Sequence, residues 1–78
     1  MNYDLAVMAL DGLSRSPVTV AIEKGTVKIF GDSAGLKELA RLFLLLGSDN
    51  VASGESVVLS PGIHVSKQSP AIEIELTG

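Results

Sequence analysis

The chain has 78 residues, of which 46% are hydrophobic and 19% charged, with a formal net charge of −3 and no cysteine. A chain of this length forms one domain over residues 1–78 and buries only ~60–65% of its unfolded surface, which excludes a large core. The missing cysteines exclude disulfides and thiolate metal sites, and scattered basic residues with three aromatic ones argue against a nucleic-acid partner.

Composition also bears on assembly and location. The charged fraction lies below the typical ~25%, and a small chain with so much aliphatic surface has trouble burying it all. We therefore expect a homo-oligomer, most simply a dimer. Residues 1–4 (MNYD) are acidic, unlike the start of a secretion signal. The apolar runs, such as Leu42 to Leu46, are far shorter than the ~20 residues that span a membrane, so we expect a cytoplasmic protein without membrane contact.

The segment from Tyr3 to Leu13 fits two kinds of secondary structure. Apolar residues at positions 5, 8, 9 and 13 have helical spacing, whereas those at positions 3, 5, 7 and 9 alternate as in a strand. We favour a strand, because the hairpin that follows needs a partner for its sheet. Residues 14–17 then form a turn.

Alternation from Val18 to Phe30 predicts a β-hairpin. Its turn is Lys24-Gly25, where glycine accepts the positive φ of a tight turn. If Glu23 pairs with Thr26, one face of the sheet carries four aliphatic side chains that a helix can cover. These are Val20, Ile22, Val27 and Ile29. Phe30 then points to the outer face, toward a second interface or a larger core.

The strongest pattern predicts a helix from Ser33 to Gly47. Its expected core face consists of Leu36, Leu39, Ala40, Phe43 and Leu46. Asp32 or Ser33 can cap the N-terminus with a side-chain oxygen. Gly47 stands where a left-handed C-terminal cap is common.

The rest of the chain predicts short strands. After a loop over residues 48–56, we expect strands at 57–59 and 71–76, with residues 63–65 as a further short strand or edge. In the last strand, Glu73 and Glu75 point outward and residues 72, 74 and 76 inward. The expected fold is a two-layer α+β domain, with one mainly antiparallel sheet of about four to six strands and a single main helix on one face.

Few residues in the sequence suggest catalysis or metal binding. His64 is the only histidine, and one imidazole without cysteines or a nearby carboxylate pair more simply marks a strand edge than a base or metal ligand. Glu73 and Glu75 lie roughly 7 Å apart on a strand, which a solvated face explains. If the pair has a role, it meets a basic patch on a partner. The sequence predicts no catalytic residue, no cofactor and no metal.

Leu42 and Leu45 lie away from the expected core face of the helix. They are exposed if the sheet covers only one side, and exposed apolar clusters tend to mark contact surfaces. The functional interpretation is an oligomer or partner interface. The alternative is that the N-terminal segment, or the loop over residues 48–56, folds over these leucines.

Two stretches carry a family resemblance. They run from Val27 to Ala40 (VKIFGDSAGLKELA) and from Ser69 to Leu76 (SPAIEIEL). They resemble the immunity protein thirty-two family of bacterial polymorphic-toxin systems, in its strand, turn and helix start and in its serine-containing turn and final strand. The family strand that often carries histidines corresponds to SVVL at 56–59, and the first sixteen residues have no counterpart. The resemblance implies a small α+β protein that neutralises a cognate toxin by binding it.

Two functions of different kinds remain. The first is a non-enzymatic binding protein, an immunity-type inhibitor that contacts a bacterial toxin through Glu73 and Glu75, with Leu42, Leu45 and His64 as further contact residues. The second is a structural or ligand-binding subunit of a homo-oligomer, with a pocket at the subunit interface to which His64 contributes.

Overall fold

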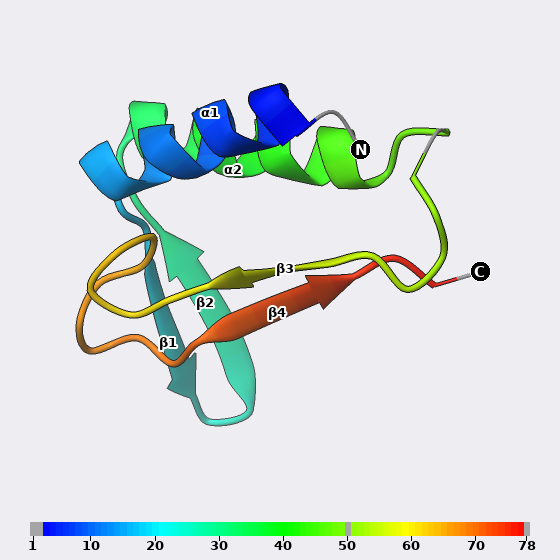
Figure 1. Cartoon of the computed structure of the whole chain (residues 1–78). Helices are drawn as coiled ribbons and strands as arrows, with labels where there is room; N and C mark the ends of the chain where they lie inside the picture. Colours follow the sequence, from blue (N-terminus) through cyan, green and yellow to red (C-terminus); the bar gives the residue numbers. More distant parts are fainter. Residues whose placement is uncertain (1–2, 50, 78) are drawn as a thin grey trace.

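Two helices and two small antiparallel sheets, each of two strands, make up the part of the chain that the computed structural model describes, residues 3–49 and 51–77. The elements are α1 (Tyr3–Arg15), β1 (Thr19–Glu23), β2 (Thr26–Phe30), α2 (Ser33–Leu46), β3 (Ser56–Leu59) and β4 (Ile72–Glu75). Figure 1 shows α1 and α2 side by side, with β3 and β4 running beneath them. The α+β class is confirmed, whereas the single larger sheet and the single main helix are wrong.

The N-terminal segment, predicted as a strand, is the helix α1. Its buried residues recur at helical spacing and are Ala6, Ala9, Gly12 and Leu13. Three of them are small, which lets α1 approach α2 closely. The side chains of residues 3 to 5, which belong to both predicted patterns, lie outside the described residues.

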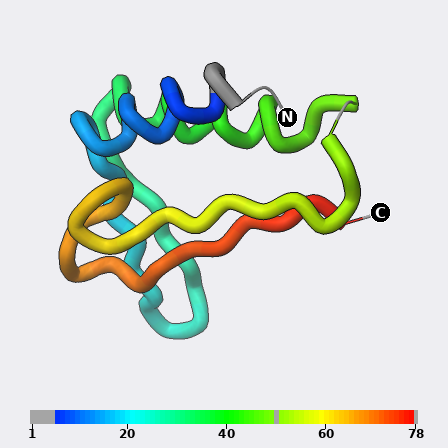
Figure 2. The backbone as a smooth tube through the Cα atoms, in the orientation of Figure 1, coloured from blue at the N-terminus to red at the C-terminus, as the bar shows by residue number. Residues whose placement is uncertain are grey.

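The sequence argument for a strand is that the hairpin needs a neighbour for its sheet, but a loop supplies that neighbour instead. Val65 forms an isolated parallel bridge with Val18, and the Ser69 hydroxyl accepts the backbone N–H of Val20 at 2.8 Å. Figure 2 shows this loop (yellow to orange) curling beside the start of β1. Residues 63–65 are therefore a turn with one bridging residue, not a short strand.

The ends of α2 confirm one predicted cap and correct the other. Asp32 is the N-cap, and its Oδ1 accepts the N–H of Gly35 at 2.7 Å. Gly47 follows the helix, but its φ of −85° is not left-handed. Its N–H donates to the carbonyl of Phe43 in ordinary helical fashion. Asn50, within the predicted loop over 48–56, lies outside the described residues.

The buried face of α2 differs from the predicted one. It consists of Gly35, Leu39, Leu42 and Leu46. Leu36 and Phe43 are instead 44% exposed, and Ala40 is exposed as well. At ~100° per residue, the observed stripe is rotated by roughly 60° from the expected one. The rotation follows from the packing of α1 against α2, which the prediction did not include.

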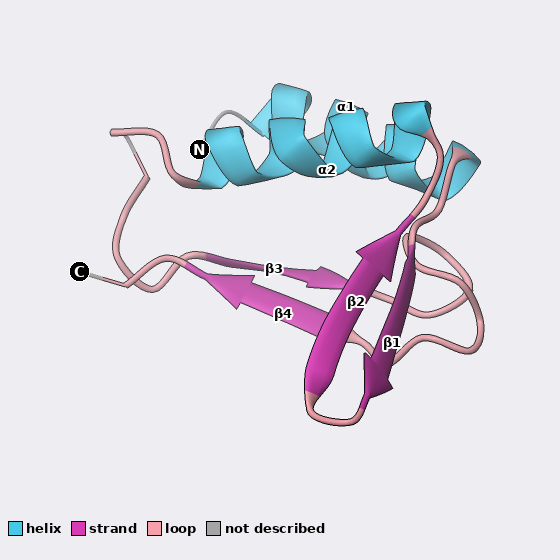
Figure 3. Ribbon diagram, turned by 180° about the vertical axis from the view of Figure 1, so that it is seen from behind, coloured by secondary structure: helices cyan, strands magenta, loops and turns pink. Residues whose placement is uncertain are grey.

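The first hairpin has the predicted register. The pairs include Glu23 with Thr26, Ile22 with Val27, and Val20 with Ile29. Lys24 and Gly25 form the turn with φ values of 51° and 80°. The prediction that the helix covers the aliphatic face of the hairpin is wrong, except at the end of the hairpin that is nearest to the helices. Figure 3 shows the hairpin projecting away from the helices, so that only its root reaches the core.

The second sheet lies under the helices and closes the core. Val57 and Leu59 of β3 are buried, residues 72 and 74 of β4 are half-buried, and Glu73 and Glu75 are exposed, as predicted. The core cluster is Ala9, Leu13, Val18, Val20, Leu39, Leu42, Val57, Leu59 and Val65. Neither described helix is long and apolar enough to cross a lipid bilayer.

Candidate functional site

The outer face of the second sheet carries the two predicted glutamates. Glu73 pairs with Val58 and Glu75 with Ser56, and all four side chains are exposed. Alternate residues of a strand point to the same side, roughly 7 Å apart. Because the neighbouring residues of both strands face the core, this side points away from the helices. We call these four residues the acidic face.

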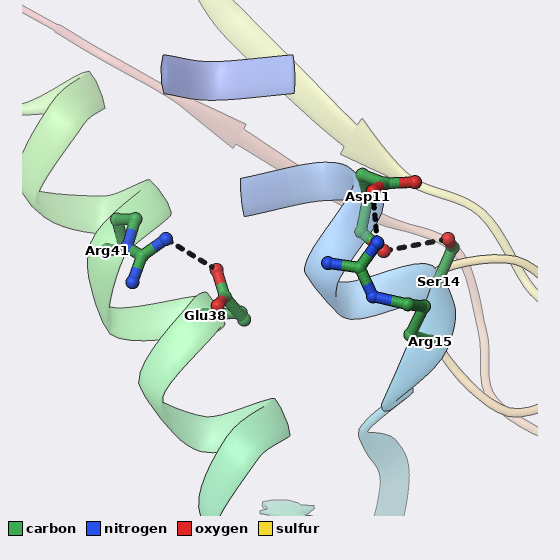
Figure 4. Close-up of polar contacts among 5 residues, drawn as sticks. All are labelled: Asp11, Ser14, Arg15, Glu38 and Arg41. Atoms are coloured by element: carbon green, nitrogen blue, oxygen red, sulfur yellow. Dashed lines mark hydrogen bonds and ion pairs between the residues drawn. The ribbon is translucent and has the colours of Figure 1, made fainter. Parts of the chain in front are cut away.

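The carboxylates of the acidic face form no ion pair with the side chains that the structure describes. The ion pairs found among them join Arg15 to Asp11 and Arg41 to Glu38. Both pairs lie on the helices, as Figure 4 shows, with the Glu38–Arg41 pair at 3.3 Å. The negative charge of Glu73 and Glu75 is therefore left uncompensated and can meet cations of a partner.

Hydrogen bonds from the side chain and the backbone hold His64 in the turn that follows β3. Its Nδ1 accepts the N–H of Ser60 at 3.2 Å, and its carbonyl oxygen accepts the N–H of Val18 at 3.4 Å. Partial burial lowers the pKa of His64, which favours the neutral ring that can accept this bond. The half-buried position agrees with a structural histidine, although it lies in a turn and not on a strand edge.

The described residues gather no site for a metal or a small ligand. They contain no group of three or more histidine, aspartate or glutamate side chains placed to hold an ion. No pocket is found in this part of the chain either.

The two predicted contact leucines do not form an exposed cluster. Leu42 is 0% exposed within the core, and Leu45 is partly buried against it. The N-terminal segment does cover this side, because α1 packs along α2. A partner cannot reach Leu42, because its side chain is buried. Leu44, two residues further along α2, is 76% exposed.

Sequence reasoning missed the largest apolar surface of the hairpin. Ile22, Val27 and Ile29 are 66%, 62% and 42% exposed, although their alternation was read correctly. The alternation specifies that these side chains share a face, but not whether another layer covers it. Sequence reasoning also missed Ser69, which is buried. Its hydroxyl accepts the N–H of Val20 and forms a hydrogen bond with the hydroxyl of Ser66.

Comparison with known proteins adds no relative. No family model, no curated protein and no solved structure matches the chain. The resemblance to the immunity protein thirty-two family is therefore carried by the quoted residues alone.

Proposed function

We propose that the protein acts by binding another protein, without catalysis, and that the acidic face is its contact surface for a basic patch on that partner. One observation carries the proposal: Glu73 and Glu75 are exposed on one side of β4, and neither has an ion-pair partner among the described residues. Opposite charges on two surfaces accelerate encounter and select the partner.

The backbone adds to the suitability of this surface. Pairing of β3 with β4 fixes the spacing of the two carboxylates, so little backbone freedom is lost on binding. Val58, which is 51% exposed, pairs with Glu73 and offers an apolar contact beside the charges. Protein interfaces commonly combine apolar contacts at the centre with a polar rim.

The resemblance supplies the class of partner that we propose. It is a bacterial toxin that the protein neutralises by direct contact in the cytoplasm, as an immunity protein does. His64 and Leu42 have no part in this proposal, because one closes a turn and the other belongs to the core.

A binding measurement with the product of the neighbouring gene tests the proposal. The double variant Glu73→Lys/Glu75→Lys should weaken binding at least about 100-fold, because two contacts become repulsive. Binding of the unaltered protein should also weaken as salt is raised from about 0.05 to 0.5 M, since salt screens exposed charges.

The matched control is Glu23→Lys/Asp49→Lys, which makes the same change in net charge at two exposed positions outside the acidic face. It should bind nearly as well as the unaltered chain. Equal binding by both double variants would remove the acidic face from the proposal. Absence of any binding by the unaltered protein would contradict a toxin encoded by that gene.

A further inference from the structure

The edge of β4 that points away from β3 is open in the part of the chain that the structure describes. Among the described strands, β4 pairs with β3 alone, in a separate sheet of two. In Figure 3, the hairpin of β1 and β2 runs at an angle to β4 and does not continue its sheet. The backbone of β4 is therefore able to accept a further strand.

The hydrogen bonds to β3 identify which backbone groups point to this open edge. Leu76 donates its N–H to the carbonyl of Glu55 at 2.9 Å, which continues the pairing of the two strands. In an antiparallel pair, residues bonded to the neighbouring strand alternate with residues whose N–H and C=O point the other way. Residues 72, 74 and 76 are thus bonded to β3, and the N–H and C=O of Glu73 and Glu75 point to the open edge.

The other unpaired strand edges of the described chain lack this combination of backbone and charge. The outward backbone groups of β2 belong to Val27 and Ile29, and those of β3 belong to Ser56 and Val58. On β4 the same positions carry two carboxylates, which form no ion pair with the described side chains. A strand that pairs with β4 therefore meets two negative charges at alternate positions.

We infer, on the basis of the proposed function, that the basic patch of the partner is an extended segment that adds to β4 as a third, antiparallel strand. Lysine or arginine at two alternate positions of this segment lies beside Glu73 and Glu75. The residues between them are aliphatic and extend the apolar layer of Ile72 and Ile74, which are half-buried against the core. In this mode of recognition, main-chain hydrogen bonds supply affinity and alternate side chains supply specificity.

The charges of β4 decide which strand fits. Opposite charges directly across an antiparallel pair are favourable, and like charges are destabilising. A second copy of β4 is therefore not the occupant, because it would place glutamates beside Glu73 and Glu75. A segment with alternating basic and aliphatic residues matches both faces of the strand.

A synthetic peptide, acetyl-Thr-Val-Lys-Val-Lys-Val-Thr-amide, tests the inference by titration into the full, isotope-labelled chain. In antiparallel addition, the N–H groups of its lysines donate to the carbonyls of Glu73 and Glu75, and the N–H groups of its valines point away. Methylation of both lysine nitrogens should weaken binding at least about tenfold, because two backbone hydrogen bonds are lost. The matched control methylates the nitrogens of the two valines that follow the lysines, and it should bind nearly as well as the parent peptide.

Amide hydrogen exchange gives an independent measurement on the chain itself. With saturating peptide, the N–H groups of Glu73 and Glu75 should exchange several-fold more slowly, whereas that of Ile74, already bonded to β3, should change little. Glu73→Lys/Glu75→Lys should bind the parent peptide at least about tenfold more weakly, because two attractive pairs become repulsive.

Three results would overturn strand addition. They are equal binding by the two methylated peptides, unchanged exchange at Glu73 and Glu75, and no binding of the parent peptide up to about 5 mM, since so short a contact is expected to dissociate near 1 mM. None of them bears on the charges of the acidic face, which the double lysine variant tests separately with the product of the neighbouring gene.

Discussion

The contact between the end of α1 and the start of α2 leaves no room for a methyl group at Gly35. A Cβ there would lie 2.5 Å from the carbonyl oxygen of Ser16 and 3.3 Å from Oδ1 of Asp32. The oxygen of Ser16 belongs to the backbone and cannot rotate away, so α2 has to shift. Overpacking of this kind costs about 1–3 kcal/mol, and a displaced Asp32 cap costs about 1 kcal/mol more.

Against this cost, alanine in a helix is about 1 kcal/mol more favourable than glycine. The free energy of unfolding of Gly35→Ala should therefore fall by about 1–3 kcal/mol. For a domain of this size, each kcal/mol lowers the melting temperature by about 4–8 °C. Thermal and urea unfolding followed by far-UV circular dichroism should show a melting temperature lower by roughly 4–24 °C.

Gly12→Ala provides the matched control on the other helix. A Cβ at Gly12 would lie 2.5 Å from Cδ of Glu38. This atom and Cγ, which would lie 2.6 Å away, belong to a flexible side chain that can turn outward and give up its partly buried ion pair with Arg41, worth about 1 kcal/mol. The helix preference of alanine offsets that loss, so stability should change by less than about 1 kcal/mol. Unchanged or higher stability of Gly35→Ala would refute the described approach of α2 to the Ser16 carbonyl.

Three further predictions use the same unfolding assays. Ser69→Ala should lower the free energy of unfolding by about 1–3 kcal/mol, because it leaves the N–H of Val20 buried without a partner. Leu42→Ala should cost about 2–5 kcal/mol and Leu44→Ala less than about 0.5 kcal/mol, since the first side chain is in the core and the second is exposed; similar losses would contradict the helix orientation. Burial lowers the pKa of His64 from 6.5, so the unfolded chain binds its proton more tightly. Stability should be complete above about pH 6.5 and fall as the pH drops below it, and His64→Asn should flatten this part of the urea-midpoint profile.

Features specified by neighbouring residues could be predicted from the sequence. The hairpin register follows from alternation on both sides of Lys24-Gly25, where Gly25 readily accepts the positive φ of a tight turn and Lys24 adopts one as well. The Asp32 cap needs only a carboxylate three residues before a free N–H. The exposure of Glu73 and Glu75 follows from the two-residue period of β4 between half-buried isoleucines.

Features decided by distant parts of the chain could not be predicted in this way. The first segment fits both a helix and a strand, and the choice depended on what pairs with β1. Along α2, leucines occur on nearly every side, so periodicity does not fix which of them face inward. Gly35 was the available signal, because a glycine within an otherwise leucine-rich helix indicates that another backbone approaches there.

The burial of Leu42 and the exposure of Ile22 have the same physical cause. The prediction assigned one helix to cover one sheet, so the aliphatic face of the hairpin was buried and the far side of α2 was exposed. In the structure, α2 packs on α1 and the helix layer lies over β3 and β4, which leaves no helix to cover the distal part of the hairpin. Ile22, Val27 and Ile29 are therefore exposed, as are Leu36, Phe43 and Leu44 of α2.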